Sequence, residues 1–167
     1  MAVRPITVLG DDVLRQRAKR VPQVDGSIQR LVEDMIDTMR DAGGVGLAAP
    51  QVGVPLRVVI IGIPGEEVTA LINPEIVKRS GERKVTEGCL SVPGYWAEVT
   101  RAISVTAKGH DLQGRQVRVK AKDDLLAQAL EHEIDHINGV LYIDHLESLD
   151  ELRETALEPE EEGSAEL

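Results

Sequence analysis

The sequence predicts a single α+β domain in which antiparallel or mixed β-sheets pack around one central helix, with a second, amphipathic helix nearer the N-terminus. Apolar residues recur at helical spacing over 27–41 and again over 123–138, whereas short β-branched runs separated by Gly, Pro and Asp fill the region between them. The 167 residues are 42% apolar, which suits one ordinary domain with a substantial core. That core is expected to consist of Leu, Ile, Val and Ala, because the chain has no Phe and one Trp.

Two helices are predicted in the N-terminal quarter of the chain. A short helix that begins with an aspartate is expected over 11–20. The amphipathic helix is expected over 27–41, where the apolar residues share one face. Asp25 or Ser27 can cap its start, and Gly43 can end it.

Short β-branched runs predict the strands, and a Gly-rich stretch before them, "GGVGLAAPQVGVP", is expected to be a loop. The predicted strands are, in chain order, "LRVVIIGI", "TALINP" (ended by Pro74), "EVTRAISVTAKG" and "RQVRVKA", with a turn at "DLQG" between the last two and a final short strand at "VLYID".

The helix predicted over 123–138 ends at Gly139 and has two occupied faces, which is typical of a helix inside a domain. One apolar stripe is expected to pack on the core: Leu126, Leu130, Ile134 and Ile137. A second, partly polar stripe consists of Leu125, Ala129, His132 and His136, with Glu133 between the two stripes. Asp135 lies off both stripes, and we expect it to pair with Arg101 and so tie the helix to a sheet.

The pattern "HEIDH" within this helix predicts a metal site. His132 and His136 are four residues apart, so both project from one face and can bind one ion. Glu133, beside the first of them, is placed to take a proton from a water that the ion activates. The alternative is two ordinary polar histidines on a partly buried helix.

The third ligand decides the class of metal site. The extended protease pattern would require a His at position 142, where this chain has Tyr142. A downstream glutamate, Glu151 or Glu154, would lie at the edge of an acidic tail. Cys89 is the better candidate, because one thiolate and two imidazoles leave a tetrahedral ion one open position, as in catalytic sites. The alternative for Cys89 is a small buried apolar residue, and its setting among glycines and polar residues in a loop-like segment argues against it.

Charge and composition exclude some classes of function. The net charge is −10, and the segment 150–167 carries eight acids and one base. We therefore expect a catalytic domain over 1–149 and an acidic, flexible tail over 150–167. The sequence has no basic stripe of the kind that would predict nucleic-acid readout. It also has no apolar run long enough to cross a bilayer and no signal-peptide pattern at its start. A lone cysteine and these features predict a cytoplasmic protein.

Three segments together resemble peptide deformylase. They are "GVGLAAPQ" (44–51), "EGCLS" (87–91) and "HEIDH" (132–136), in the family's order, and the likeness covers about residues 3–149. The resemblance implies a hydrolase of protein biosynthesis that removes the formyl group from the N-terminal formyl-methionine of new polypeptides and releases formate.

The resemblance also implies roles for single residues. Cys89, His132 and His136 would hold one divalent metal ion, with Fe²⁺ as the usual ion and Zn²⁺, Ni²⁺ or Co²⁺ as substitutes. Glu133 would be the general base and then the acid. Gln51, through its amide, and Leu90, through its backbone N–H, would bind the formyl oxygen, and Gly46 would bind the backbone of an extended peptide. The walls of the methionine slot would be Val45, Leu125, Ala129 and His132.

The implied partners are formylmethionyl nascent peptides and, transiently, the ribosome, for a monomeric enzyme without membrane contact. The acidic tail is a poor candidate for binding rRNA, because phosphate would repel it. Two other classes stay open from the residues alone. A small metalloprotease or aminopeptidase would cleave unformylated peptides, and a catalytically silent metal-binding or ribosome-associated module would lack the base. We expect His110 and His145 to be surface or hydrogen-bonded residues and not ligands.

Overall fold

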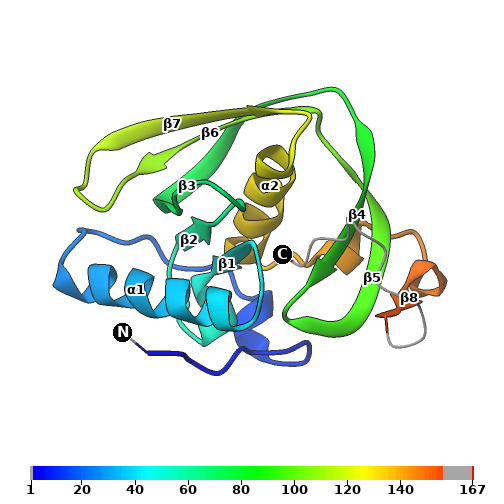
Figure 1. Ribbon diagram of the computed structural model, residues 1–167, viewed down its shortest axis with the longest axis horizontal. Helices are drawn as coiled ribbons and strands as arrows, with labels where there is room; N and C mark the ends of the chain where they lie inside the picture. The colour runs from blue at the N-terminus through cyan, green and yellow to red at the C-terminus, as the bar shows by residue number, and fades with distance from the viewer. Residues whose placement is uncertain (1, 156–166) are drawn as a thin grey trace.

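Two antiparallel sheets and two helices make up the computed structural model of the chain, which describes residues 2–155 and 167 (Figure 1). The larger sheet has the order β1-β2-β3-β6-β7 and the smaller one β4-β5-β8. The strands of the larger sheet are β1 (Gly46–Ala48), β2 (Val58–Ile61), β3 (Thr69–Ser80), β6 (Ser104–His110) and β7 (Gln116–Lys122). Those of the smaller sheet are β4 (Arg83–Cys89), β5 (Val92–Arg101) and β8 (Arg153–Glu154). The predicted α+β class is therefore confirmed.

Helix α2 (Leu125–Ile137) lies at the centre of the molecule, between the two sheets (Figure 1). Asp124 caps its start by accepting a hydrogen bond from the Ala127 backbone N–H at 2.8 Å. Gly139 follows its end with φ of 78°, a left-handed conformation that glycine adopts without steric cost. Ten of its thirteen residues are buried, so the prediction of an interior helix is confirmed.

Helix α1 (Gly26–Asp41) covers the opposite face of the larger sheet, and Asp25 is its N-cap. Strand β2 shows why both helices are needed. Its residues alternate between two cores: Val59 and Ile61 pack in the cluster that contains α2, while Val58 and Ile60 pack in the cluster that contains α1. A strand buried on both faces must be apolar throughout, which explains the run "VVII".

Several predicted element boundaries were wrong. The expected loop at "GGVGLAAPQVGVP" contains β1 and a 3₁₀ helix, η2 (Ala49–Val52). Strand β3 continues past Pro74, because the ladder has a register shift between Ile72 and Glu75, where a missing N–H is tolerated. The run "EVTRAISVTAKG" is two strands that belong to different sheets, β5 and β6.

The short helices also differ from expectation. The helix expected over 11–20 is one 3₁₀ turn, η1 (Asp12–Arg15), with Asp11 as its cap. The strand expected at "VLYID" is another 3₁₀ turn, η3 (Tyr142–His145), whose Asp144 side chain accepts from the Leu141 N–H at 2.9 Å.

The acidic tail is described only in part. Its first residues contain most of η4 (Leu149–Glu151) and strand β8, which pairs with β5. Residues 156–166 lie outside the described part of the chain, and the prediction of a flexible tail falls mainly on them. Among the described residues, neither α-helix has the length and apolarity that a bilayer span requires.

Candidate metal centre and catalytic site

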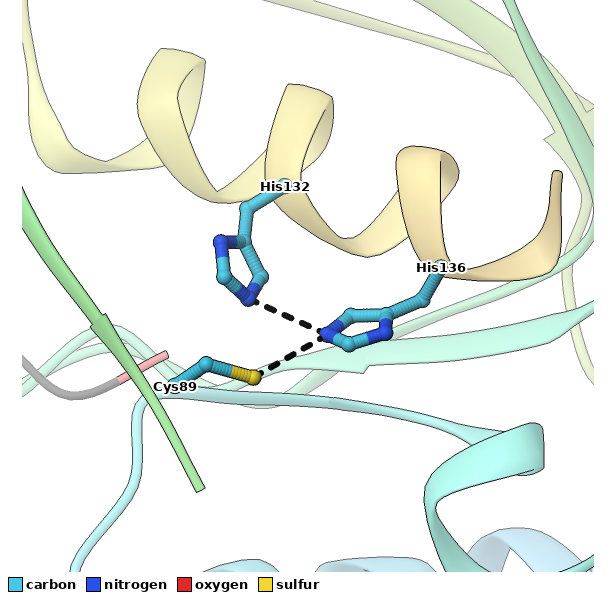
Figure 2. Close-up of side chains that lie close together, drawn as sticks. All are labelled: Cys89, His132 and His136. Carbon is cyan, nitrogen blue, oxygen red and sulfur yellow. Dashed lines mark hydrogen bonds between the residues drawn. The ribbon is translucent and has the colours of Figure 1, made fainter. Parts of the chain in front are cut away.

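Cys89, His132 and His136 converge beneath α2, as Figure 2 shows. Cys89 is the last residue of β4, and both histidines come from one face of α2. The Cys89 Sγ lies 3.3 Å from the His136 Nε2, and that nitrogen lies 3.2 Å from the His132 Nε2. The three side chains are buried, with at most 3% of each residue exposed. The sequence placed Cys89 in a loop; it is instead held by a strand.

The donor set fits a tetrahedral metal ion. Bonds of about 2.0–2.1 Å to nitrogen and 2.3 Å to sulfur place neighbouring tetrahedral ligands roughly 3.3–3.6 Å apart. The two separations, 3.2 Å between the histidine nitrogens and 3.3 Å from sulfur to nitrogen, are close to that range. Three protein ligands leave one position for water or substrate, which is typical of a catalytic site.

Glu87 orients the first histidine. Its carboxylate contacts the Nδ1 of His132, so the proton is placed on Nδ1 and the Nε2 lone pair faces the other ligands. Burial alone would raise the pKa of Glu87, but His132 and the Arg101 guanidinium together hold that pKa at about 2. The carboxylate in turn raises the pKa of His132 against the effect of burial, and a metal bound at Nε2 would displace the extra proton. Burial lowers the pKa of His136 well below its usual value, so this imidazole is neutral and ready to bind.

Arg101 connects the smaller sheet to α2 through Asp135, the pairing that was predicted from the sequence. Its Nη1 lies 2.8 Å from the Asp135 Oδ2, so that prediction is confirmed. The same guanidinium binds both oxygens of Glu87, at 2.5 and 3.0 Å. The His145 Nε2–H donates to the Asp135 Oδ2 at 2.8 Å, which agrees with the predicted hydrogen-bonded role of His145. Neither His145 nor His110 belongs to the ligand cluster.

Glu133 has a different environment from Glu87. It is fully buried, and neither carboxylate oxygen has a hydrogen-bond partner among the described residues. Burial raises the pKa of Glu133 to about 7, although His132 opposes the shift. The side chain lies against Gly46, where an added Cβ would be 3.0 Å from the Glu133 Cδ. A buried carboxyl that titrates near neutrality can both accept and donate a proton.

Two hydrogen-bond donors lie beside Cys89. The amide of Gln51 is fixed on η2: its Oε1 accepts from the Ala48 N–H at 3.0 Å, and its Nε2 donates to the Ser91 hydroxyl at 3.0 Å. That same Nε2 lies 3.6 Å from the Cys89 Sγ. Leu90 follows Cys89 directly, so its backbone N–H lies next to the metal ligand.

Gly46 lies on the edge strand of the larger sheet, and its backbone groups point to the free edge. The Gly62 N–H donates to the Val45 carbonyl at 2.8 Å, and Gly46 is opposite Ile61. In an antiparallel ladder this makes Gly46 and Ile61 a non-hydrogen-bonded pair. The N–H and C=O of Gly46 are therefore directed away from β2, where an extended peptide could pair with them.

The predicted walls of the methionine slot belong to one hydrophobic cluster. Val45, Leu125 and Ala129 all pack in the cluster between α2 and the larger sheet. His132 projects from the same helix, one turn beyond Ala129.

Sequence reasoning missed Glu87 and Ser91, although both are in the quoted "EGCLS" motif. The missing information was the strand. Residues two apart in a strand share a face, so the recognition of β4 would have placed the carboxylate of Glu87 on the side of Cys89 that faces α2.

The chain is similar to known proteins along nearly its whole length. The family described as Polypeptide deformylase matches residues 3–152. A curated peptide deformylase from Dehalococcoides mccartyi is 56% identical over 168 residues, which cover 100% of this chain and 99% of the relative. Another, from Thermomicrobium roseum, is 48% identical and covers 99% of this chain and 98% of the relative.

Solved structures give the same result for the fold. A crystal structure of a peptide deformylase from Legionella pneumophila has a TM-score of 0.86 and 49% identity, and covers 90% of this chain and 89% of that one. A peptide deformylase from Synechococcus elongatus, solved in complex with actinonin, has a TM-score of 0.84 and 41% identity, with 87% of this chain and 80% of that chain covered.

Proposed function

This chain belongs to the polypeptide deformylase family, and we propose how its own residues carry out the family's reaction, the removal of the N-formyl group from nascent peptides. One observation carries the proposal. A Cys/His/His ligand set lies next to a buried, unpaired carboxylate whose pKa is close to neutrality. Such a site suits hydrolysis of an amide that must receive a proton as it breaks.

We propose Cys89, His132 and His136 as the ligands of one divalent ion, which would supply Lewis-acid activation of water and of the formyl group. Glu133 removes a proton from the attacking water as the water oxygen bonds to the formyl carbon. The carbon–nitrogen bond then breaks, Glu133 gives its proton to the departing amine, and formate leaves. The burial of Glu133 and the lack of a hydrogen-bond partner for its carboxylate oxygens among the described residues support this role, because both oxygens are left available for proton transfer.

Gln51 and Leu90 are proposed to stabilise the formyl oxygen as it gains negative charge. Two features support the assignment: the Gln51 amide is held in place on both sides, and the Leu90 N–H lies next to Cys89. Donors that are fixed before the reaction need no reorganisation, and the loss of one such donor typically costs about 3–4 kcal/mol of transition-state stabilisation.

The peptide is proposed to lie as an extended strand along the free edge of β1. Gly46 would bind its backbone, which the outward direction of the Gly46 N–H and C=O supports. The methionine side chain would enter the cluster that contains Val45, Leu125 and Ala129. By analogy with the Synechococcus relative, we expect actinonin to bind in this site.

The remaining assignments are also proposals. The catalytic domain is assigned to residues 1–149, and 150–167 to a tail. The native ion is assigned as Fe²⁺, because the family resemblance implies it, although one thiolate and two imidazoles also suit Zn²⁺, Co²⁺ or Ni²⁺. We also propose a cytoplasmic monomer that meets its nascent substrates transiently at the ribosome, and the single cysteine is consistent with the cytoplasmic location.

Formate release from formyl-Met-Ala-Ser, measured anaerobically on protein of known metal content, tests the proposed function. The unformylated Met-Ala-Ser is the control substrate. Release of formate without loss of methionine supports the proposal. Cleavage of methionine from the control peptide would support an aminopeptidase, and metal content without either activity would support a silent metal-binding protein.

A further inference from the structure

Leu167, the last residue of the sequence, lies inside the proposed active site. Its backbone N–H donates to the Gly88 carbonyl at 3.3 Å, and its backbone carboxylate oxygen accepts from the Leu90 N–H at 3.1 Å. Gly88 and Leu90 are the two neighbours of Cys89. The chain end marked C in Figure 1 accordingly lies between β1, β4 and α2.

These two hydrogen bonds are those of a peptide that adds to a sheet. In a parallel pair, one residue bonds through its N–H and C=O to the two residues that flank its neighbour. Leu167 makes this pattern around Cys89. The carboxylate oxygen of Leu167 thereby occupies the N–H of Leu90, which is the donor proposed for the formyl oxygen.

The side chain of Leu167 fills the proposed methionine slot. Leu167 is fully buried, although it belongs to a segment whose composition predicts solvent exposure. It packs in the same hydrophobic cluster as Val45, Leu125 and Ala129. Leucine and methionine are unbranched at Cβ and similar in volume, so a slot that accepts one accepts the other.

We propose that Leu167 is a ligand of its own chain's peptide site and competes with substrate. This proposal depends on the proposed function in one respect: that function identifies the site as the one that binds the peptide substrate. Leu167 is attached through its nitrogen to Glu166 and carries no formyl group, so its occupancy of the site is non-productive. Because the ligand is tethered, its effective concentration is set by the chain and not by the amount of protein in solution.

The kinetic consequence follows from competition. Substrate binds only the open fraction of molecules, so the apparent KM is the intrinsic KM divided by that fraction. At saturating substrate the leucine is displaced, and kcat is unaffected. A threefold fall in KM on removal of the leucine corresponds to a site that is closed in two of three molecules.

The test compares Leu167→Asp with a matched control, Leu149→Asp. The first introduces a charge into the buried slot, and the second makes the same change at a leucine that is 67% exposed. Leu167→Asp is expected to lower the KM for formyl-Met-Ala-Ser at least threefold at unchanged kcat, and to tighten actinonin binding, measured by calorimetry, by the same factor. Leu149→Asp should change neither quantity.

Two further variants distinguish displacement of the leucine from a folding defect in Leu167→Asp. Leu167→Ala should lie between wild type and Leu167→Asp, and Leu167→Met should keep the wild-type KM, because methionine refills the slot. Wild-type values of KM and actinonin affinity in both Leu167→Asp and Leu167→Ala would overturn the proposal while leaving the deformylase activity established. A wild-type KM that falls when the enzyme itself is diluted would also overturn it, since the occupant would then be the tail of a second copy.

Discussion

The most direct test of the catalytic geometry is the addition of one methyl group at Gly46. A Cβ at this position would overlap the Oε2 of Glu133 and lie 3.0 Å from its Cδ and 3.1 Å from its Cγ. Gly46→Ala therefore displaces the proposed base without removing it, and leaves the three metal ligands in place.

The size of the effect follows from these distances. Carbon atoms in contact are about 3.5–4.0 Å apart, so the Glu133 carboxyl must move by roughly 0.5–1 Å. A displacement of about 1 Å at a reacting group can cost on the order of 100-fold in rate. We expect Gly46→Ala to lower kcat/KM by about 10- to 100-fold, with bound metal unchanged.

The assay is formate release, with metal content measured on the same sample. Gly26→Ala is the matched control, because a Cβ there would meet only the end of the Arg30 side chain, at 3.2 Å, in the first turn of α1. A double-mutant cycle identifies the cause. Glu133→Ala alone should keep its metal and lose most activity, and Gly46→Ala should cost little more in that background. Wild-type kcat/KM in Gly46→Ala, or two effects that simply multiply, would refute the reasoning.

Four other predictions concern the metal and the core. Cys89→Ser should bind metal far more weakly, because a neutral hydroxyl replaces a thiolate, and unchanged metal content after dialysis would exclude Cys89 as a ligand. Glu87→Gln should lower metal affinity by about 10- to 100-fold in a chelator competition, through loss of the charge that orients His132; a wild-type affinity would contradict that role. Apoprotein reloaded without oxygen should be most active with Fe²⁺ and decay in air, whereas the Ni²⁺ or Co²⁺ forms should be active and air-stable; a zinc form as fast as the iron form would refute the iron assignment. Leu130→Ala should lower the free energy of unfolding by about 2–5 kcal/mol in urea titrations, and a loss below 1 kcal/mol would mean that the site collapses around the cavity.

Helix α2 could be predicted from the sequence almost to the residue. Its two stripes and its glycine stop are local signals that agree with one another, and the structure places the helix at Leu125–Ile137 within the predicted 123–138. The pair of His132 and His136 was predictable for the same reason, because their separation is a property of the helix alone.

The part of the site that is built from strands was harder to predict from the sequence. Strand β4 reads "RKVTEGC", with charged residues and a glycine, and carries little of the apolar alternation that marks a strand. Its identity depends on pairing with β5, which is a long-range contact. Cys89 was found through its chemistry, as the only thiol, whereas Glu87 has no distinguishing chemistry without the strand that aims it. The depth of Leu167 was not predictable either, because an acidic segment gives no local signal for a buried last residue.

The arrangement of the ligands reduces the geometry of the metal site to the relation between two rigid parts. Both histidines and Glu133 belong to α2, so their mutual distances are fixed by one helix. Cys89 belongs to the smaller sheet, and polar contacts join that sheet to the helix: Glu87 with His132, Arg101 with Asp135, and the Gln128 amide with the Thr86 carbonyl. Sliding or rotation of the sheet relative to the helix therefore changes the separation of the Cys89 sulfur from the histidine nitrogens. Strain in the coordination geometry would thus follow the position of the smaller sheet relative to α2, and the polar contacts between them resist that movement.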